Sequence, residues 1–348
     1  MKKPHPLTAK KIVIVTDSWT NNISGVVTSL LHTKKGLEKK GFEVSIIHPE
    51  LFRNAPLPFY SEIRMAILPK RKFERILKQK KPDYIHIATE GTLGLSARGI
   101  CVKNNWKFTT SYHTRMPEYV SIRVRPLKGA TYKYLRWFHS KSQKTTVSTP
   151  SLKKELESKS FKNVICFPLG VDLKLFKKNP KAKIPDKLVK AGLKKPVFTF
   201  LGRVAPEKNI ETFLKCDLPG SKLVIGDGPQ RKDLEKEFKG SAVFVGRKKA
   251  TEVADLLSIS DVFVFPSKTD TFGLAIIEAL ACGVPVAAYN VQGPKNIITN
   301  GVDGFLGGSL KANALKCLNI DRKNCRKTAM KYSWDNFTDE FIKNLVHI

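Results

Sequence analysis

The sequence lacks several features that define large classes of proteins. Its 348 residues contain no apolar run near the ~20 residues that cross a bilayer, so no membrane-spanning helix is expected. Residues 1–11 are charged and lead into no apolar stretch of signal-peptide length, which indicates a cytoplasmic protein. Low-complexity segments and short repeats are also missing. With 41% hydrophobic residues, the chain is predicted to be globular.

Metal and redox motifs are equally scarce. The six cysteines form no C-x-x-C pair and accompany no clustered histidines, so we expect reduced thiols and no metal site. No D-x-D pattern is present either. Gly226 and Gly228 supply only two glycines of a dinucleotide fingerprint, which argues against an NAD-linked sugar-modifying enzyme and against a bound cofactor.

Acidic residues are the third shortage. Sixty-two Lys and Arg face 30 Asp and Glu, for a net charge of +32. The excess is uneven, since residues 1–170 hold 32 basic and 11 acidic residues (net +21) and residues 171–348 hold 30 and 19 (net +11). The amino-terminal half is therefore expected to meet an anionic partner. A membrane surface and a nucleic acid both fit this charge, and so does a merely solvated lysine-rich surface.

One basic stretch contains no acid at all. Residues 123–141 interleave six basic residues with four aromatic ones, Tyr132, Tyr134, Trp137 and Phe138. Basic side chains near anionic lipid contribute roughly 1 kcal/mol each, and aromatic rings sit at headgroup level. This stretch is predicted to contact a membrane through Trp137 and four of its six basic residues, Arg123, Arg125, Lys133 and Arg136.

Short apolar strands alternate with helical stretches along the whole chain, which predicts an α/β protein with two parallel sheets, because parallel strands need crossover helices. The length favours two domains. We expect one over residues 1–170 and one over 171–331, with a closing amphipathic helix in 332–348 that packs back on the first. The expected strands are 11–16, 42–48, 84–88, 108–112, 144–147, 197–201, 222–225, 242–245, 262–265 and 286–289.

The most informative segment follows the strand 262–265. Residues 267–273 turn the chain, and residues 274–282 have the composition of a buried helix closed by a glycine and a proline. Amides near Phe272 and Gly273 would point out of a positive helix end, where a diphosphate binds. Asp270 outside the helix and Glu278, about two turns in, could accept hydrogen bonds from sugar and ribose hydroxyls. Alternatively, Asp270 is a helix cap and Glu278 a solvated residue.

Further candidates follow other strands, where such folds bind ligands. Gly202, Arg203 and Lys208 come after the strand ending at Leu201, and the two cations suit a phosphate. Ser24 and Gly25 begin a helix after the first strand. His113 follows the strand ending at Tyr112.

Together these residues resemble the retaining family-four glycosyltransferases. The resemblance rests on Gly202-Arg203 with Lys208, on Gly226-Asp-Gly-Pro229, on Phe244-Val-Gly246, on the Asp270-x7-Glu278 pair and on Tyr332-Ser-Trp-Asp335. The sequences Thr269-Asp-Thr-Phe-Gly273, His113-Thr-x-x-Pro-Glu-Tyr119 and Ser148-Thr-Pro-Ser-Leu152 are similar to the subgroup that glycosylates diacylglycerol-type lipids. Asp270 stands where the family as a whole usually has Glu. Asn21 and Ser24 depart from the subgroup, in which Pro and Asn are more usual at those places.

The resemblance implies a GT-B fold, two facing Rossmann-like domains with a central cleft. It also implies roles for single residues: Arg203 and Lys208 hold the diphosphate, Glu278 the ribose, Asp270 the sugar and the Gly246 region the base, with His113 near the transferred sugar. The remaining implied contacts are to the donor, through Gly25, Gly202, Phe272, Gly273 and Leu274, and to the acceptor, through Glu118 and Tyr119.

The expected function is therefore metal-independent, retaining transfer of a hexosyl unit from a nucleotide sugar such as UDP-glucose or GDP-mannose. The expected acceptor is a diacylglycerol-type lipid, reached from the inner face of the cell membrane, where the protein would associate peripherally. A soluble or cell-envelope glycan is the alternative acceptor. A basic nucleic-acid-binding protein is the alternative of another class, although we expect no nucleic acid partner.

Overall fold

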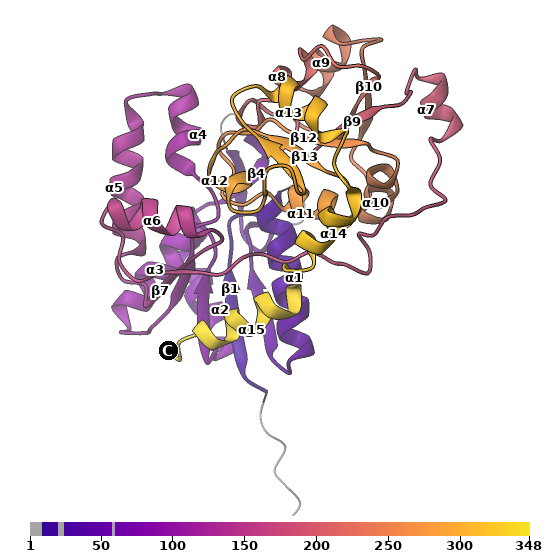
Figure 1. Cartoon of the computed structure of the whole chain (residues 1–348). Coiled ribbons are helices and arrows are strands. Elements are labelled where there is room, and N and C mark those ends of the chain that lie inside the picture. Colours follow the sequence, from indigo (N-terminus) through magenta and orange to yellow (C-terminus); the bar gives the residue numbers. More distant parts are fainter. Residues whose placement is uncertain (1–8, 20–23, 58–59) are drawn as a thin grey trace, which may run out of the picture. The chain divides into compact units, whose positions relative to one another are not determined.

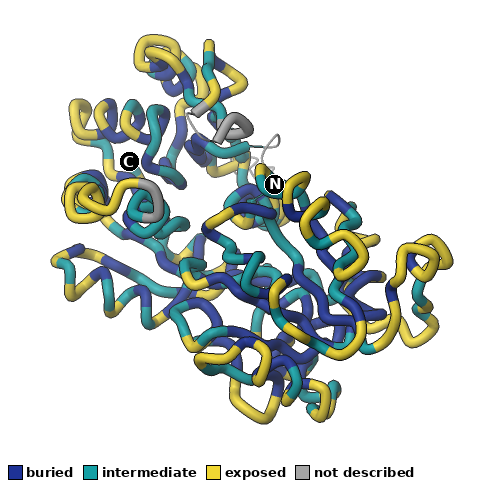
Figure 2. The backbone as a smooth tube through the Cα atoms, turned by 90° about the horizontal axis from the view of Figure 1, so that it is seen from above, coloured by how far each residue is buried: buried dark blue, intermediate teal, exposed yellow. Residues whose placement is uncertain are grey.

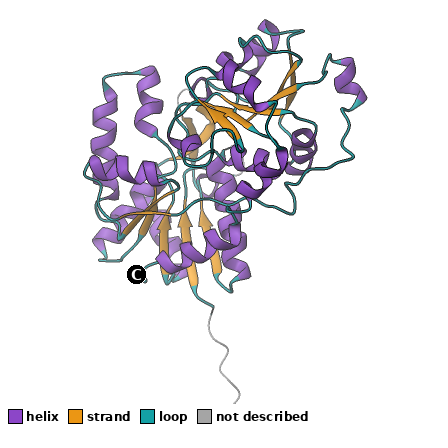
Figure 3. Cartoon of the chain, viewed as in Figure 1, coloured by secondary structure: helices purple, strands orange, loops and turns teal. Residues whose placement is uncertain are grey.

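The structure is a computed structural model that describes residues 9–19, 24–57 and 60–348. The chain divides into two compact units. Unit 1 comprises Met1–Val120, Val124–Phe167 and Asp335–Ile348, and unit 2 comprises Ser121–Arg123 and Pro168–Trp334. Figure 3 shows strands with helices packed on both sides in each unit.

Unit 1 is built on a six-stranded parallel sheet in the order β2-β1-β5-β6-β7-β8. Its first strand lies inside the sheet, between β2 and β5, so the chain changes direction at that point. A separate antiparallel pair, β3 and β4, precedes β5. The strands are β1 (Lys11–Val15), β2 (Glu43–Ile47), β3 (Asn54–Leu57), β4 (Tyr60–Ala66), β5 (Tyr84–Ile87), β6 (Thr109–Ser111), β7 (Lys144–Val147) and β8 (Val164–Cys166).

Helices cover both faces of this sheet because successive strand residues point to opposite sides. Val13 and Ile87 belong to a core shared with α2, α3 and α5, which therefore pack on one face. Figure 2 shows buried backbone in the interior and exposed backbone mainly on the outside. The helices are α1 (Gly25–Lys39), η1 (Pro49–Leu51), α2 (Lys70–Lys80), α3 (Thr92–Lys103), α4 (Met116–Arg123), α5 (Leu127–His139) and α6 (Pro150–Ser158).

The last helix, α15 (Trp334–Asn344), packs on the other face, next to α1 (Figure 1). The Phe341 ring lies 4.8 Å from that of His86 in β5, and Phe337 lies 5.4 Å from Phe167. Gly36 of α1 lies against Thr338, where a larger side chain would collide. Both phenylalanines are buried, as their helical spacing predicts.

Unit 2 repeats this plan with a parallel sheet in the order β11-β10-β9-β12-β13-β14. Again the first strand, β9, lies inside the sheet, between β10 and β12. The strands are β9 (Val197–Leu201), β10 (Ser221–Ile225), β11 (Ala242–Gly246), β12 (Val262–Phe265), β13 (Val286–Ala288) and β14 (Gly304–Leu306). The helices are α7 (Asp186–Lys190), η2 (Pro206–Lys208), α8 (Ile210–Leu214), α9 (Arg231–Glu237), α10 (Ala250–Ser258), α11 (Leu274–Ala281), α12 (Gln292–Lys295), α13 (Leu310–Cys317) and α14 (Arg322–Ala329).

The two parallel sheets and the alternation of strands and helices confirm the predicted fold class. Each of the ten expected strands is present, with ends that shift by at most one residue. The sequence analysis missed β3, β4, β8 and β14. All six cysteines are unpaired thiols, four of them buried. Within the described residues, no helix has both the length and the apolar character that crossing a membrane requires.

Candidate functional site

The predicted donor residues of unit 2 gather where its sheet changes direction. The strands β9 and β12 are neighbours, so their carboxyl ends lie side by side. The loop after β9 holds Gly202, Arg203 and Lys208, and the loop after β12 holds Asp270 and Gly273. Ligands of open α/β sheets bind at this point, because the two loops leave it in opposite directions.

A short ion pair connects the two loops. The Lys208 ammonium donates to the Asp270 carboxylate, and both side chains are largely buried. The other Asp270 oxygen, Oδ2, is buried without a hydrogen-bond partner among the described residues. An unsatisfied buried acceptor costs free energy unless a ligand supplies a donor. A sugar hydroxyl can do so.

Glu207 connects the loop after β9 to the loop after β12. Its side chain is buried and lies 3.5 Å from the Arg203 guanidinium. Its carbonyl accepts a hydrogen bond of 3.1 Å from the Thr269 hydroxyl in the second loop. Glu207 was absent from the candidates drawn from the sequence, because a single glutamate in a loop gives no signal of burial.

Glycines allow close backbone contacts around this site. Gly226, with φ 139°, lies so close to the Gly202 carbonyl that any Cβ there would collide with it. Gly246, with φ 69°, leaves room for the Arg231 guanidinium, 2.7 Å from where a Cβ would lie. Arg231 also pairs with Asp227 at 2.9 Å. A cation therefore lies beside the region expected to hold the base.

The helix α11 begins at this site. Gly273 is its N-cap residue with φ 103° and provides no side-chain cap. The Ile276 amide bonds the Gly273 carbonyl, so the amides of Leu274 and Ala275 are the ones that can meet an anion. Phe272 is only 2% exposed and packs edge-on against Tyr332 at 5.7 Å. A Cβ added to Gly293 would lie only 2.6 Å from the Phe272 carbonyl oxygen, so glycine is needed for α12 to pack closely against this turn.

Glu278 is the fifth residue of α11, so it lies just over one turn from the helix start rather than the two turns predicted. Burial raises the pKa of Glu278 to about 7. This result argues against the alternative of a solvated helix residue. It makes Glu278 an ionisable group that changes charge near neutral pH.

At the corresponding place in unit 1, the protein fills the helix start itself. Asp17 follows β1, and its carboxylate accepts hydrogen bonds from the Leu93 amide at 2.8 Å and the Thr89 hydroxyl at 2.8 Å. It thereby caps α3. Burial raises the pKa of Asp17. Asp17 was not among the predicted site residues, since the helix that it caps begins 75 residues further along the chain.

Two other predicted residues of unit 1 have defined surroundings. Gly25 begins α1, and the Ser24 hydroxyl caps it by accepting from the Val27 amide at 3.3 Å. Asn21 lies outside the described residues. Burial lowers the pKa of His113 to about 4, so this imidazole is neutral at physiological pH. It can therefore exchange hydrogen bonds but supplies no charge.

The basic stretch 123–141 forms the end of α4, a turn and α5. Arg125, Lys133 and Arg136 are exposed, whereas the side chain of Arg123 lies outside the described part of the chain. Trp137 is 50% exposed, with the Arg98 guanidinium 4.0 Å from its ring centre.

Of the four aromatic rings that the composition places at headgroup level, only that of Trp137, the one named as a membrane contact, is exposed. Phe138 is fully buried in the core of unit 1. The Tyr132 hydroxyl turns inward to Glu118 at 2.8 Å and Glu155 at 2.9 Å. Helical geometry explains this difference, because only one side of α5 faces solvent. Glu118 also pairs with Arg115 at 3.2 Å, and Tyr119 follows it in α4.

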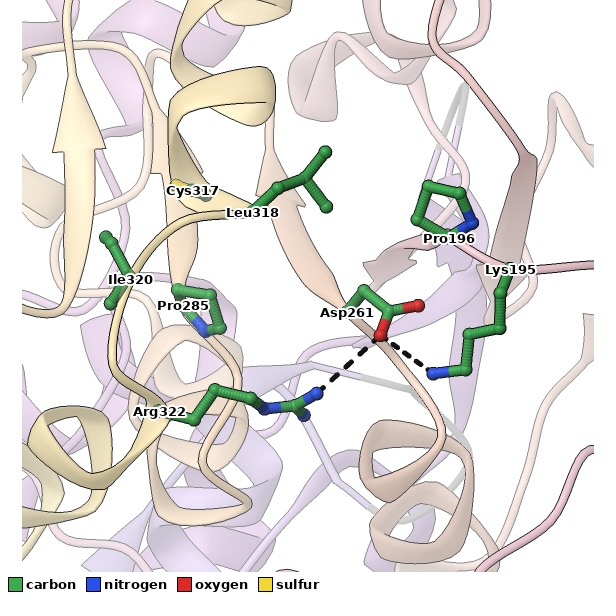
Figure 4. Close-up of a pocket in the computed structure, with 8 residues that line it drawn as sticks. All are labelled: Lys195, Pro196, Asp261, Pro285, Cys317, Leu318, Ile320 and Arg322. Atoms are coloured by element: carbon green, nitrogen blue, oxygen red, sulfur yellow. Dashed lines mark hydrogen bonds and ion pairs between the residues drawn. The ribbon is translucent and has the colours of Figure 1, made fainter.

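A separate cavity of about 340 Å³ opens at the opposite end of the unit 2 strands (Figure 4). Its polar wall is Asp261, which pairs with Lys195 at 2.8 Å and lies 3.7 Å from Arg322. The Asp261 carboxylate thus meets two cations and also accepts a hydrogen bond from the Val197 amide, which holds the amino end of β9. None of the predicted donor residues lines this cavity.

The described residues contain no group of three or more His, Cys, Asp or Glu that could hold a metal ion. Metal independence therefore stays a prediction, to be tested by chelation.

Comparisons with known proteins define the class. Residues 23–175 match the family described as "Glycosyltransferase Family 4", and residues 181–331 match "Glycosyl transferases group 1". The two Rossmann-like units have the GT-B fold of glycosyltransferases. The chain belongs to the group 1 and family 4 glycosyltransferases, as its motifs predict.

Several curated relatives are similar over most of this chain. Sulfoquinovosyl transferase SQD2 of Arabidopsis thaliana is 28% identical, over 87% of this chain and 63% of that protein. This chain thus spans less than two thirds of that relative's length. A GDP-mannose-dependent alpha-mannosyltransferase of Corynebacterium glutamicum is 26% identical, over 85% and 76%. Alpha-monoglucosyldiacylglycerol synthase of Streptococcus pneumoniae is 29% identical, over 85% and 75%.

Solved structures show the same fold at lower identity. Sucrose-phosphate synthase of Thermosynechococcus elongatus has a TM-score of 0.78 at 20% identity, covering 96% of this chain and 98% of that one. HepE of Anabaena, solved with UDP and glucose, has a TM-score of 0.73 at 15% identity, with the same coverage.

Proposed function

We propose that the protein transfers a hexosyl unit from a nucleoside-diphosphate sugar to a diacylglycerol-type membrane lipid, with retention of anomeric configuration and without a metal ion. The observation that carries the donor part is the pair of loops joined by Lys208 and Asp270 beside the uncapped start of α11. This arrangement combines two cations, free helix amides and a carboxylate within one unit.

The leaving group determines what the site must do. A nucleoside diphosphate departs with added negative charge, and donors placed beforehand stabilise that charge more than water can. Arg203, Lys208 and the first amides of α11 are suited to this task. Asp270 Oδ2 would accept a hydrogen bond from a sugar hydroxyl, and Glu278 from the ribose.

Retention without an enzyme nucleophile requires attack on the same face that the diphosphate leaves. The departing phosphate oxygen then takes the proton of the acceptor hydroxyl as the new glycosidic bond forms and the old one breaks. His113, neutral at physiological pH, would orient a hydroxyl of the transferred sugar.

The lipid acceptor is supported by the relatives and by charge. One relative is named alpha-monoglucosyldiacylglycerol synthase, and another is named sulfoquinovosyl transferase SQD2. The basic excess lies mainly in residues 1–170. Exposed Arg125, Lys133 and Arg136 with Trp137 would contact an anionic membrane near the acceptor. Peripheral association with the inner face of the cell membrane follows from this proposal.

A second candidate is mannosyl transfer to another acceptor. Three curated relatives are named GDP-mannose-dependent alpha-mannosyltransferases, at 25–26% identity. The acceptor would then be a soluble or cell-envelope glycan instead of a lipid, and the basic surface would not serve membrane binding.

A donor and acceptor screen separates these functions. Each of UDP-glucose, UDP-galactose and GDP-mannose is incubated with diacylglycerol liposomes or with soluble glycans, with and without EDTA, and released nucleoside diphosphate is measured. We expect nucleoside diphosphate to be released with liposomes, and we expect EDTA not to suppress this release. NMR should show an α-linked product. Release only with soluble glycans would overturn the lipid acceptor, and full suppression by EDTA would overturn metal independence.

A further inference from the structure

Unit 1 carries a second basic surface, outside the stretch 123–141. It begins between β4 and α2 and continues through α2 to Lys81. Residues 67–81 contain seven basic residues and a single acid, Glu74. We call residues 67–81 the α2 surface.

Two aliphatic side chains project from the start of the α2 surface. Leu68 is 92% exposed and Ile67 51% exposed, and these are adjacent residues. Leu68 has φ 45°, a left-handed conformation that leucine rarely adopts. Single exposed apolar residues are ordinary, but an exposed pair in a tight turn that opens a basic helix calls for an apolar or interfacial partner.

The helix itself is firmly held, so its outer side is a fixed platform. Phe73 and Leu77 are buried in the core of unit 1 and attach α2 to the sheet. Lys72 is engaged by the Leu51 carbonyl at 2.5 Å, and Lys78 by Glu74 at 3.5 Å. The remaining cations of the surface are exposed: Lys70, Arg71, Arg75, Lys80 and Lys81.

The α2 surface also shares a layer with the basic side of α5. Phe73 of α2 and Phe138 of α5 pack into one core, against the same face of the unit 1 sheet. The exposed Lys133 and Arg136 of α5 therefore belong to the same helical layer as the cations of α2. Charge spread over two helices of one layer suits an extended anionic partner better than a small ligand.

We propose that the α2 surface docks on anionic lipid, with Leu68 and Ile67 entering the headgroup region while the cations of α2 meet lipid phosphates. The inference takes its partner from the lipid acceptor proposed above. Nucleic acid would attract the same cations, but it offers no apolar medium for two exposed aliphatic side chains. Insertion of apolar side chains together with cations is how interfacial helices bind bilayers.

Co-sedimentation with vesicles tests the proposal without any donor or acceptor. The vesicles are either neutral phosphatidylcholine or contain a third phosphatidylglycerol, roughly the charge of an anionic leaflet. The proteins are the wild type, I67S/L68S and R71Q/R75Q/K80Q. Matched controls lie in unit 2, where Met330 is 62% exposed and Lys323, Lys327 and Lys331 are exposed: M330S and K323Q/K327Q/K331Q.

We expect R71Q/R75Q/K80Q to lower partitioning onto anionic vesicles roughly tenfold or more, with the difference shrinking at high salt. I67S/L68S should lower it severalfold at every salt concentration, because apolar insertion is not screened. The control variants should bind like the wild type. Circular dichroism establishes that each variant is folded.

Three outcomes overturn the inference: no binding of the wild type to anionic vesicles, equal binding by the α2 variants, or an equal loss in the controls. A salt-sensitive shift of duplex DNA that is lost in R71Q/R75Q/K80Q, without vesicle binding, would assign the surface to nucleic acid. Turnover of a short-chain, water-dispersed diacylglycerol is measured in parallel. Its persistence in the α2 variants separates a failure of docking from a failure of the proposed reaction.

Discussion

The two units place opposite charges at equivalent points of the same topology. In unit 1 the first strand, β1, is followed by Asp17, whose carboxylate caps α3 after the neighbouring strand β5. In unit 2 the first strand, β9, leads to Arg203 and Lys208, beside α11 after the neighbouring strand β12. An internal acid thus occupies the helix start in unit 1, whereas unit 2 brings cations to an uncapped helix start.

The difference shows how one fold yields both a structural cap and an anion site. A helix start attracts negative charge in either case. When the chain supplies that charge, as Asp17 does, the site is closed and stabilises the fold. When the chain supplies cations instead, an external anion must complete the site, and a nucleoside diphosphate has the required charge. The following predictions test this contrast.

The largest effect is expected at the cations of unit 2. Lys208→Ala should lower kcat by on the order of 10²–10³, the effect of losing one preorganised donor to the transition state, about 2.7–4 kcal/mol. The fold should survive with reduced stability, because the largely buried Asp270 carboxylate loses its cation. Turnover by release of nucleoside diphosphate is the measurement, and the exposed Lys323→Ala in α14 is the control. Near wild-type turnover would remove Lys208 from the reaction.

Arg203→Ala should reduce kcat similarly but should also lower stability. Its removal leaves the Glu207 carboxylate, only 3% exposed, without the guanidinium 3.5 Å away. The double variant Arg203→Ala with Glu207→Gln should recover stability without recovering turnover. Thermal unfolding measures the stability. Recovery of both would make Arg203 a structural residue.

Glu278→Gln should weaken donor binding by about 10-fold or more, because hydrogen bonds to a charged group contribute about 1.5–3 kcal/mol. With a pKa of about 7, Glu278 ionises as the pH rises from 6 to 8. Wild-type affinity for the donor should therefore rise over this range, while that of the variant stays flat. Calorimetric titration at several pH values measures both, and parallel pH profiles would disprove the ribose contact.

The same carboxyl should also affect stability, with a definite sign. The unfolded Glu278 ionises near 4.5, whereas the folded one stays protonated to about pH 7, so the ligand-free protein loses stability as the pH rises between these values. Glu278→Gln lacks this loss. The stability difference between Glu278→Gln and the wild type should therefore shift in favour of the variant between pH 4.5 and a pH above 7, by no more than about 3 kcal/mol. Urea unfolding at the two pH values decides.

Asp17→Ala should affect stability rather than donor binding. Loss of the α3 cap should cost about 1–2 kcal/mol. Thermal unfolding measures this loss, and titration with nucleoside diphosphate should give an unchanged Kd, since the donor site lies in unit 2. A large loss of affinity would contradict the division of roles between the units.

The smallest effect is expected for Gly25→Ala. Gly25 is exposed at the first position of α1, so alanine should leave stability within about 0.5 kcal/mol. If the donor diphosphate approaches this helix start, as the resemblance implies, kcat/KM should fall severalfold. Unchanged kcat/KM would limit the donor contacts to unit 2.

Most of the fold follows from the sequence because its strands are short, apolar and β-branched, as in Val262–Phe265. The strand β14 escaped because the short segment Gly304–Leu306 begins with a glycine, and β8 because Val164–Cys166 lies between Asn163 and the nearby Pro168, which leaves a short apolar run. The pair β3 and β4 escaped because Asn54–Leu57 contains a proline and little alternation.

The site could be predicted only where its residues follow a strand in sequence. Arg203 and Asp270 were found in this way. Glu207 and Asp17 were not, since their importance comes from burial and from partners distant along the chain. The surface on α5 was overestimated for the same reason, because composition does not reveal which side of a helix a Phe138 or Tyr132 occupies.

Calorimetric titration of the wild type, Lys208→Ala and Asp17→Ala with UDP and with GDP tests the central claim most directly. If the diphosphate binds between β9 and β12 of unit 2, one nucleotide should bind the wild type and Asp17→Ala with the same Kd, and Lys208→Ala at least tenfold more weakly, on the order of the 1.5–3 kcal/mol of a charged hydrogen bond. An unchanged Kd for Lys208→Ala, together with lost binding in Asp17→Ala, would place the nucleotide in unit 1 and contradict the account.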